Sequence, residues 1–101
     1  MVRGGYVFSI SAITEYEIYS GATIAQTDYW QEFLEQTQVL PFDKNVVKVA
    51  VDINSALKRK RKQIAIPDLF IAATAISNNL PLAILNLKHF EQIDDLRIVK
   101  L

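Results

Sequence analysis

The segment that most restricts the fold of this chain is residues 68–79. Pro67 suits the first position of a helix, because its missing N–H is not needed there, and Asp68 follows in the electropositive first turn. Residues 69–76 are then apolar apart from one threonine, and a helix that is apolar nearly all round has to be covered on every side. We therefore expect a central helix that ends at the Asn-Asn pair 78–79.

Short apolar runs on both sides of this helix predict strands. Residues 6–10 are rich in aromatic and β-branched residues and residues 82–85 are continuously apolar, which is typical of strands buried in a parallel sheet. Residues 64–66 form a similar, shorter run directly before the helix, and residues 97–101 have the composition of an edge strand.

Further helices are predicted from capping residues and from apolar positions spaced three and four apart. They cover residues 14–21, residues from Thr27 or Asp28 to Pro41, and residues 43–62. The first would begin with Thr14 and Glu17 in the Thr-x-x-Glu form of a capping box. Helices that alternate with short strands imply the α/β class, and 101 residues leave room for one domain.

Composition excludes several kinds of site. The chain has no cysteine, which excludes disulfides, Cys-based zinc sites and Fe–S clusters and favours a cytoplasmic protein, and its only histidine is His89. Its longest mostly apolar run, residues 64–76, is interrupted by Pro67 and Asp68 and is shorter than the ~20 residues of a membrane helix, so no membrane partner is expected.

A balanced total of 11 basic and 11 acidic residues hides one basic cluster. It consists of five consecutive residues at the end of a predicted helix: Lys58, Arg59, Lys60, Arg61 and Lys62. One interpretation is a solvated helix end that the helix dipole stabilises. The other is a contact with the phosphate backbone of RNA, whose affinity would fall steeply with salt and would not need Mg²⁺. Both remain open, and no aromatic residues are interleaved to stack on bases.

Two carboxylates could carry chemistry, since each follows a strand-like run and opens a predicted helix. These are Glu17 and Asp68. In parallel α/β sheets this position is the carboxyl edge, where ligands bind, and a divalent cation such as Mg²⁺ relieves the repulsion between two acids there. The alternative is structural, with Glu17 completing a capping box and Asp68 stabilising the first turn of a helix.

Three segments, in order, resemble the motifs of one family. Residues 11–21 (SAITEYEIYSG) resemble the second acidic motif of the PIN-domain nucleases, and specifically of the VapC-type toxins of bacterial toxin–antitoxin pairs. Residues 66–75 (IPDLFIAATA) are similar to their third motif, and residues 82–90 (LAILNLKHF) to their closing segment. Together these segments extend over nearly the whole chain.

The resemblance implies a PIN-like three-layer sandwich around a parallel sheet, with residues 1–101 forming a single, partial PIN-like domain. It implies cleavage of single-stranded RNA with Mg²⁺ or Mn²⁺, and an antitoxin protein as partner. By matching positions, Glu17 and Asp68 become the catalytic and metal-binding acids, and Thr14 becomes a supporting hydroxyl.

The departures from the family pattern concern its acids. No opening strand with the first metal-binding aspartate precedes residue 6, and the acid usual in the closing segment is replaced near Asn86 and His89. Asn86 offers a carbonyl oxygen, whereas His89 could contact a phosphate or pack beside Phe90. With two acids left, we expect weak or absent metal binding and an inactive or impaired ribonuclease. The alternative is a catalytically dead module that docks an antitoxin or a sister nuclease.

The lack of a segment that matches the family's opening strand also affects how the chain assembles. In the family it lies between the strands that match residues 6–10 and 82–85, so its absence leaves unpaired backbone edges. Direct pairing of those two strands, or a homodimer that completes the sheet, would satisfy them, and we expect the homodimer.

Overall fold

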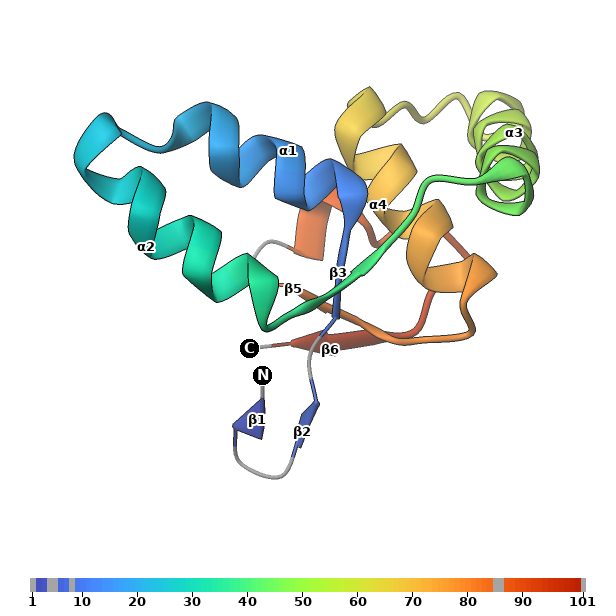
Figure 1. Cartoon of the computed structure of the whole chain (residues 1–101). Helices are drawn as coiled ribbons and strands as arrows, with labels where there is room; N and C mark the ends of the chain where they lie inside the picture. The colour runs from blue at the N-terminus through green and yellow to red at the C-terminus, as the bar shows by residue number, and fades with distance from the viewer. Residues whose placement is uncertain (1, 4–5, 8, 85–86, 101) are drawn as a thin grey trace. The chain divides into compact units, whose positions relative to one another are not determined.

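A computed structural model describes residues 2–3, 6–7, 9–84 and 87–100 (Figure 1). The chain forms two compact units, Met1–Pro41 and Phe42–Leu101. The expectation of a single domain stays a prediction. Among the described residues, no helix is both long and apolar enough to cross a membrane.

The first unit consists of a helical hairpin and two pairs of short strands. Its elements are β1 (Val2–Arg3), β2 (Tyr6–Val7), β3 (Ser9–Ser11), α1 (Ala12–Gly21), α2 (Ile24–Glu35) and β4 (Gln38–Leu40). β1 and β2 are antiparallel, whereas β3 and β4 are parallel, with Ile10 opposite Val39. The strand predicted over residues 6–10 is therefore two short strands with different partners, and β4 was not predicted at all.

Both helices of this unit begin earlier than predicted. Ser11 is the N-cap of α1, and its Oγ accepts a hydrogen bond from the Thr14 backbone N–H at 3.0 Å. The capping box predicted at residues 14–17 is therefore wrong, because Ser11 supplies a cap one turn earlier, at the end of β3. Likewise Thr23 rather than Thr27 or Asp28 precedes α2, and the Thr23 backbone N–H donates to Gln26 Oε1 at 3.0 Å.

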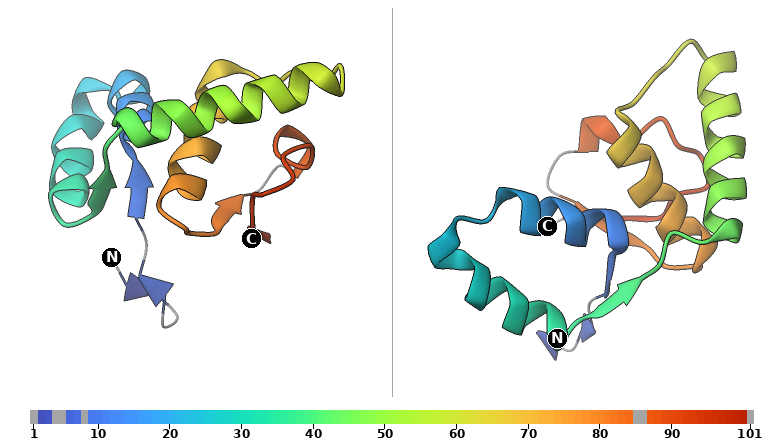
Figure 2. Two further views of the ribbon diagram at one scale, coloured as in Figure 1. Left: turned by 90° about the vertical axis from the view of Figure 1, so that its right-hand side faces the viewer. Right: turned by 45° about the horizontal axis from the view of Figure 1, so that its top comes forward.

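The second unit contains the main hydrophobic core. Its elements are α3 (Lys44–Arg59), α4 (Ile66–Ser77), β5 (Leu82–Ile84), the 3₁₀ turn η1 (Leu87–His89) and β6 (Ile98–Lys100). α3 packs against α4 and crosses it at an angle, as Figure 2 shows. The buried residues of this core are Val46, Ala50, Ile53, Leu57, Leu69, Ala72, Ala73, Ala75, Phe90, Ile93 and Leu96.

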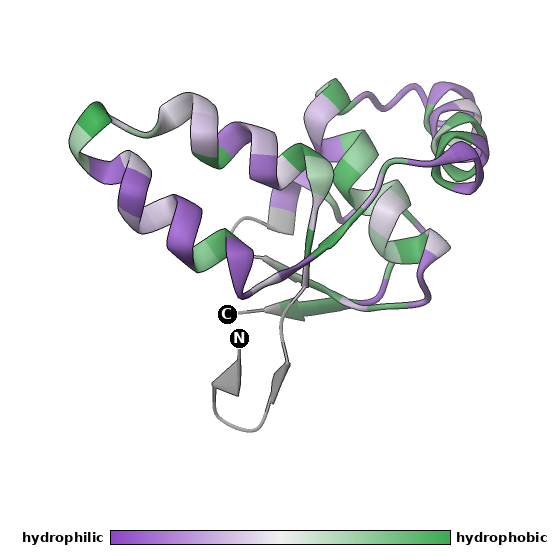
Figure 3. Ribbon diagram, in the orientation of Figure 1, coloured by the Kyte–Doolittle hydropathy of each residue, from purple (hydrophilic) through white to green (hydrophobic). Residues whose placement is uncertain are grey.

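Most predictions for the second unit are confirmed. Asp43 is the N-cap of α3, and its side chain accepts a hydrogen bond from the Val46 N–H at 3.0 Å. α4 has Pro67 in its first turn, is the most buried helix of this unit and ends at the Asn-Asn pair; its apolar character is visible in Figure 3. Residues 64–66 form no strand, because α4 already begins at Ile66.

The parallel pairing predicted for an α/β sheet is also present. β5 and β6 are parallel, with Ala83 opposite Val99. The α/β class with parallel strands is therefore confirmed, while the backbone partners found for β3 and β5 are β4 and β6 rather than each other. β3 and β5 belong to different units and each pairs along one edge, so the expected homodimer and its alternative, direct pairing of the strands near residues 10 and 82, both stay predictions.

Candidate metal site

Asp68 lies in the first turn of α4 and contacts the chain's only histidine. Its Oδ2 is 3.1 Å from Nδ1 of His89, within hydrogen-bonding distance. The Asp68 side chain is 24% exposed and that of His89 54%, so the pair is at the surface but partly shielded. The structure therefore brings together two of the residues that the sequence singled out.

The backbone that carries His89 is fixed on its C-terminal side by apolar packing. η1 ends at His89, and Phe90, Ile93 and Leu96 follow it into the core of the second unit. The His89 ring also lies beside that of Phe90, with ring centroids 6.2 Å apart, so the packing role holds on one side of the imidazole while its Nδ1 faces Asp68. Asn86 lies outside the described residues.

Glu17 and Thr14 are both in α1, in the first unit. Glu17 is exposed in the middle of the helix and does not open it. The Thr14 hydroxyl lies 3.0 Å from Oγ of Ser11, so these two hydroxyls form a polar pair at the start of the helix. Sequence reasoning missed the role of Ser11; its position at the end of β3, three residues before Thr14, is the signal that indicates it.

The residues present fit a divalent cation only in part. Mg²⁺ favours carboxylate oxygens and keeps several waters, and Asp68 supplies one such carboxylate. His89 supplies a nitrogen donor instead of a second oxygen. In the part of the chain that the structure describes, no group of three or more His, Cys, Asp or Glu residues lies together. Asp68 and His89 are the residues that would hold an ion in the second unit.

The basic cluster at the end of α3 is partly neutralised. The Lys60 Nζ forms an ion pair with Asp94 Oδ1 at 2.8 Å and donates to the Gln92 carbonyl at 3.2 Å. The other cluster residues are exposed, and Arg61 has a left-handed backbone with φ of 56°. Lys60 is thus tied to the turn around residues 92–94, while its neighbours point positive charge at solvent.

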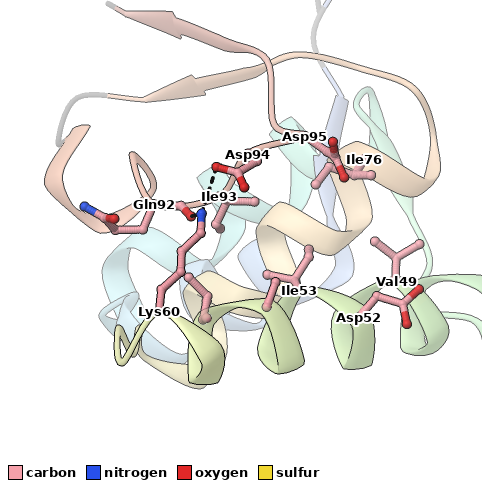
Figure 4. A pocket seen from close by; sticks show the side chains of 11 residues that line it. Val49, Asp52, Ile53, Lys60, Ile76, Gln92, Ile93, Asp94 and Asp95 are labelled. Atoms are coloured by element: carbon pink, nitrogen blue, oxygen red, sulfur yellow. Dashed lines mark hydrogen bonds and ion pairs between the residues drawn. The ribbon is translucent and has the colours of Figure 1, made fainter.

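A hollow of about 230 Å³ lies between α3 and the turn at residues 92–95 (Figure 4). Its lining combines apolar side chains, Ile53 and Ile93 among them, with the carboxylates of Asp52, Asp94 and Asp95. None of the residues predicted to bind metal lines it. This hollow is therefore a separate feature of the second unit.

Comparison with known proteins assigns the family. The PIN domain family matches residues 3–96, nearly the whole chain. The chain therefore belongs to the PIN-domain family. Within it, the similarity is to VapC ribonucleases, as the motifs in the sequence indicated: Ribonuclease VapC of Rickettsia bellii is 39% identical over 61 residues, and Ribonuclease VapC1 of Methanocaldococcus jannaschii is 33% identical over 88 residues.

The aligned part is shorter than these relatives. It covers 60% of this chain and 46% of the Rickettsia protein, and 86% of this chain and 65% of the Methanocaldococcus protein. The solved structure of DNA-bound VapBC from Salmonella typhimurium is also similar, with a TM-score of 0.80, 28% identity, and coverage of 89% of this chain and 72% of that chain. These comparisons confirm the PIN fold and the VapC-type resemblance.

Proposed function

We propose that this chain is a VapC-like ribonuclease that uses a divalent cation to cleave single-stranded RNA and is inactive or impaired as residues 1–101 alone. The observation that carries the proposal is the position of Asp68: it matches the third PIN motif, lies in the first turn of the central helix, and faces His89, near which the family motif has an acid. Glu17 is proposed as the second acid, with Thr14 and Asn86 as supporting groups.

A bound divalent cation would polarise the phosphodiester and activate water. The protein's own part is to hold that charge and the RNA. Asp68 would supply a carboxylate from a helix whose burial fixes its position, and the exposed residues of the cluster 58–62 would attract the phosphate backbone. Replacing an acid by His89 removes one negative charge from the site, which is the physical reason for the proposed impairment.

The test is to restore the acid. We expect His89→Asp to raise Mg²⁺-dependent cleavage of a single-stranded RNA above the level of the unmodified chain, and Asp68→Asn in the same background to abolish the gain. Asp52→Asn is the matched control, because Asp52 is an exposed acid of the same unit that belongs neither to the proposed metal site nor to the basic cluster. Full-rate cleavage by the unmodified chain, or no cleavage by His89→Asp with Mg²⁺ or Mn²⁺, would contradict the proposal.

A second candidate is a binding module that docks an antitoxin or a sister nuclease. It is favoured by large apolar side chains that the α1–α2 hairpin leaves exposed, with Tyr16 70% and Ile24 97% exposed and Tyr19 and Tyr29 also on the surface. Large exposed apolar side chains are typical of protein-binding surfaces, and the described part of the second unit exposes five more, namely Val47, Val51, Ile66, Leu80 and Val99. Similarity to VapBC, a family of toxin–antitoxin systems, supports an antitoxin as the partner.

This candidate is tested by co-expression with the product of a small reading frame beside the gene. A stable complex that Ile24→Lys weakens would support docking through the hairpin, whereas a complex unaffected by that change would place the contact elsewhere. The proposed homodimer is tested separately by light scattering across micromolar concentrations. A monomeric mass throughout would count against it.

A further inference from the structure

The pair formed by Asp68 and His89 combines two different donor atoms. Oδ2 of Asp68 is a carboxylate oxygen and Nδ1 of His89 is an imidazole nitrogen, and the two lie 3.1 Å apart. They come from separate segments, the first turn of α4 and η1, and the core residues Leu69 and Phe90 next to them in sequence are buried. The spacing of the two donors is therefore set by the packing of the second unit.

This spacing matches two neighbouring ligands of one metal ion. Ligands about 2.1 Å from an ion are about 3 Å apart at the right angles of octahedral coordination and about 3.4 Å apart at the tetrahedral angle that Zn²⁺ favours, which brackets the observed distance. For the imidazole to coordinate through Nδ1, its proton has to reside on Nε2, and the ion then takes the place of the hydrogen between the two side chains. Little movement of Asp68 or His89 is needed.

The donor set also determines which ions are favoured. Mg²⁺ prefers oxygen ligands, whereas imidazole nitrogen suits first-row transition ions such as Zn²⁺, which also bind mixed nitrogen and oxygen sites more tightly than Mn²⁺ does. We propose that Asp68 and His89 form a mixed-donor site that binds a first-row transition ion in preference to Mg²⁺. This inference rests on the proposed function in treating Asp68 as a metal ligand, and it adds the class of ion.

The experiment is a metal titration without RNA. Calorimetry with Zn²⁺ and with Mg²⁺ gives the two affinities, and ¹⁵N NMR follows the His89 ring, whose signals need no separation because the chain has no other histidine. We expect Zn²⁺ to bind at least about tenfold more tightly than Mg²⁺ and to shift a His89 ring nitrogen. Equal affinities, no binding of either ion, or Zn²⁺ binding without a change at His89 would overturn the proposal.

Variants separate this inference from the ribonuclease proposal. His89→Asp should reduce the preference for Zn²⁺ and raise Mg²⁺ affinity, Asp68→Asn should weaken both ions by about tenfold or more, and Asp94→Asn should leave both unchanged. If His89→Asp cleaves RNA but the unmodified chain shows no preference for Zn²⁺, the ribonuclease proposal stands and this one fails. If Zn²⁺ binds at His89 but no variant cleaves RNA, the mixed-donor site stands and the ribonuclease proposal fails.

Discussion

The structure distinguishes helix-capping roles from metal-binding roles at two acids, Glu17 and Asp68, for which the sequence left both roles open. Glu17 was open to interpretation as a capping residue, but Ser11 performs that function and Glu17 is exposed in the middle of α1. Asp68 does occupy the first turn of its helix, and it also faces His89. A helix-stabilising position and a metal-binding position are therefore compatible at Asp68, whereas Glu17 has no capping role.

This difference predicts the effect of substitutions on stability. Ser11→Ala should lower the free energy of unfolding by about 1 kcal/mol, because the backbone N–H of Thr14 loses its acceptor. Glu17→Gln should change it by less than about 0.5 kcal/mol, as is usual for an exposed side chain without a specific contact. Urea denaturation measures both. A loss at Glu17→Gln as large as that at Ser11→Ala would restore a structural role for Glu17.

At the scale of helices and strands, sequence reasoning succeeded where a helix-start signal precedes a long apolar pattern. Asp43 and Pro67 each precede such a pattern, and α3 and α4 begin close to the predicted positions. It failed where signals overlapped, as at Ser11 and Thr14, since both hydroxyls lie within one turn. It also missed β4, whose pairing with β3 joins residues 29 positions apart and leaves no local periodicity.

The candidate metal site shows the same contrast between signals within one segment and contacts between distant segments. Asp68 and the closing segment were found because each lies in a contiguous motif. The contact between Asp68 and His89 joins residues on different segments, so it emerged only from the packing of α4 against the turn that follows β5. The shared use of Glu17 and Asp68 remains a prediction for the same reason.

α3 and α4 end with the same backbone hydrogen-bond pattern, but a different residue adopts the left-handed conformation at each end. The Lys62 N–H donates to Leu57 O, and the Leu80 N–H donates to Ala75 O, both at 2.9 Å, while the preceding residues Arg61 and Asn79 adopt φ of 56° and 55°. This is the Schellman arrangement, in which glycine is usual and asparagine is tolerated.

Arg61→Gly should therefore raise the free energy of unfolding by about 0.5–1 kcal/mol, because glycine adopts this conformation without steric cost. Asn79→Gly should gain less, since asparagine already tolerates the conformation and the Asn79 Oδ1 accepts a hydrogen bond from Arg97. Thermal and urea unfolding give the comparison. A destabilised Arg61→Gly variant would mean that the arginine side chain outweighs its backbone strain.

The basic cluster gives a prediction for nucleic-acid binding. If residues 58–62 contact single-stranded RNA, Lys62→Ala should reduce the slope of log affinity against log salt by about 0.7, the value for one phosphate contact. Lys60→Ala should have a smaller effect, because its ammonium already pairs with Asp94. Asp94→Asn should increase the slope by freeing Lys60. Binding to RNA that none of these variants alters would leave the cluster as a solvated helix end.

On the scale of the whole molecule, the proposed chemistry depends on residues from both compact units. Glu17 belongs to Met1–Pro41 and Asp68 to Phe42–Leu101. An ion that binds only the folded chain adds about 2.7 kcal/mol of stability when its free concentration is 100 times its dissociation constant. Metal binding should therefore raise the melting temperature, and by less in a variant that has lost a ligand.

A double-mutant cycle tests whether Glu17 and Asp68 hold the same ion. If Glu17 and Asp68 hold one Zn²⁺ ion, Glu17→Gln and Asp68→Asn should each weaken its binding, and the double variant should lose less than the sum, because the second substitution acts on a site already disrupted. Glu15→Gln, on the same helix, is the matched control and should leave the affinity unchanged. The ion should also raise the melting temperature less in Glu17→Gln than in the unmodified chain. An unchanged affinity for Glu17→Gln would show that the ion is held by the second unit alone, and a ribonuclease built on it would then have to recruit its remaining acids from another chain.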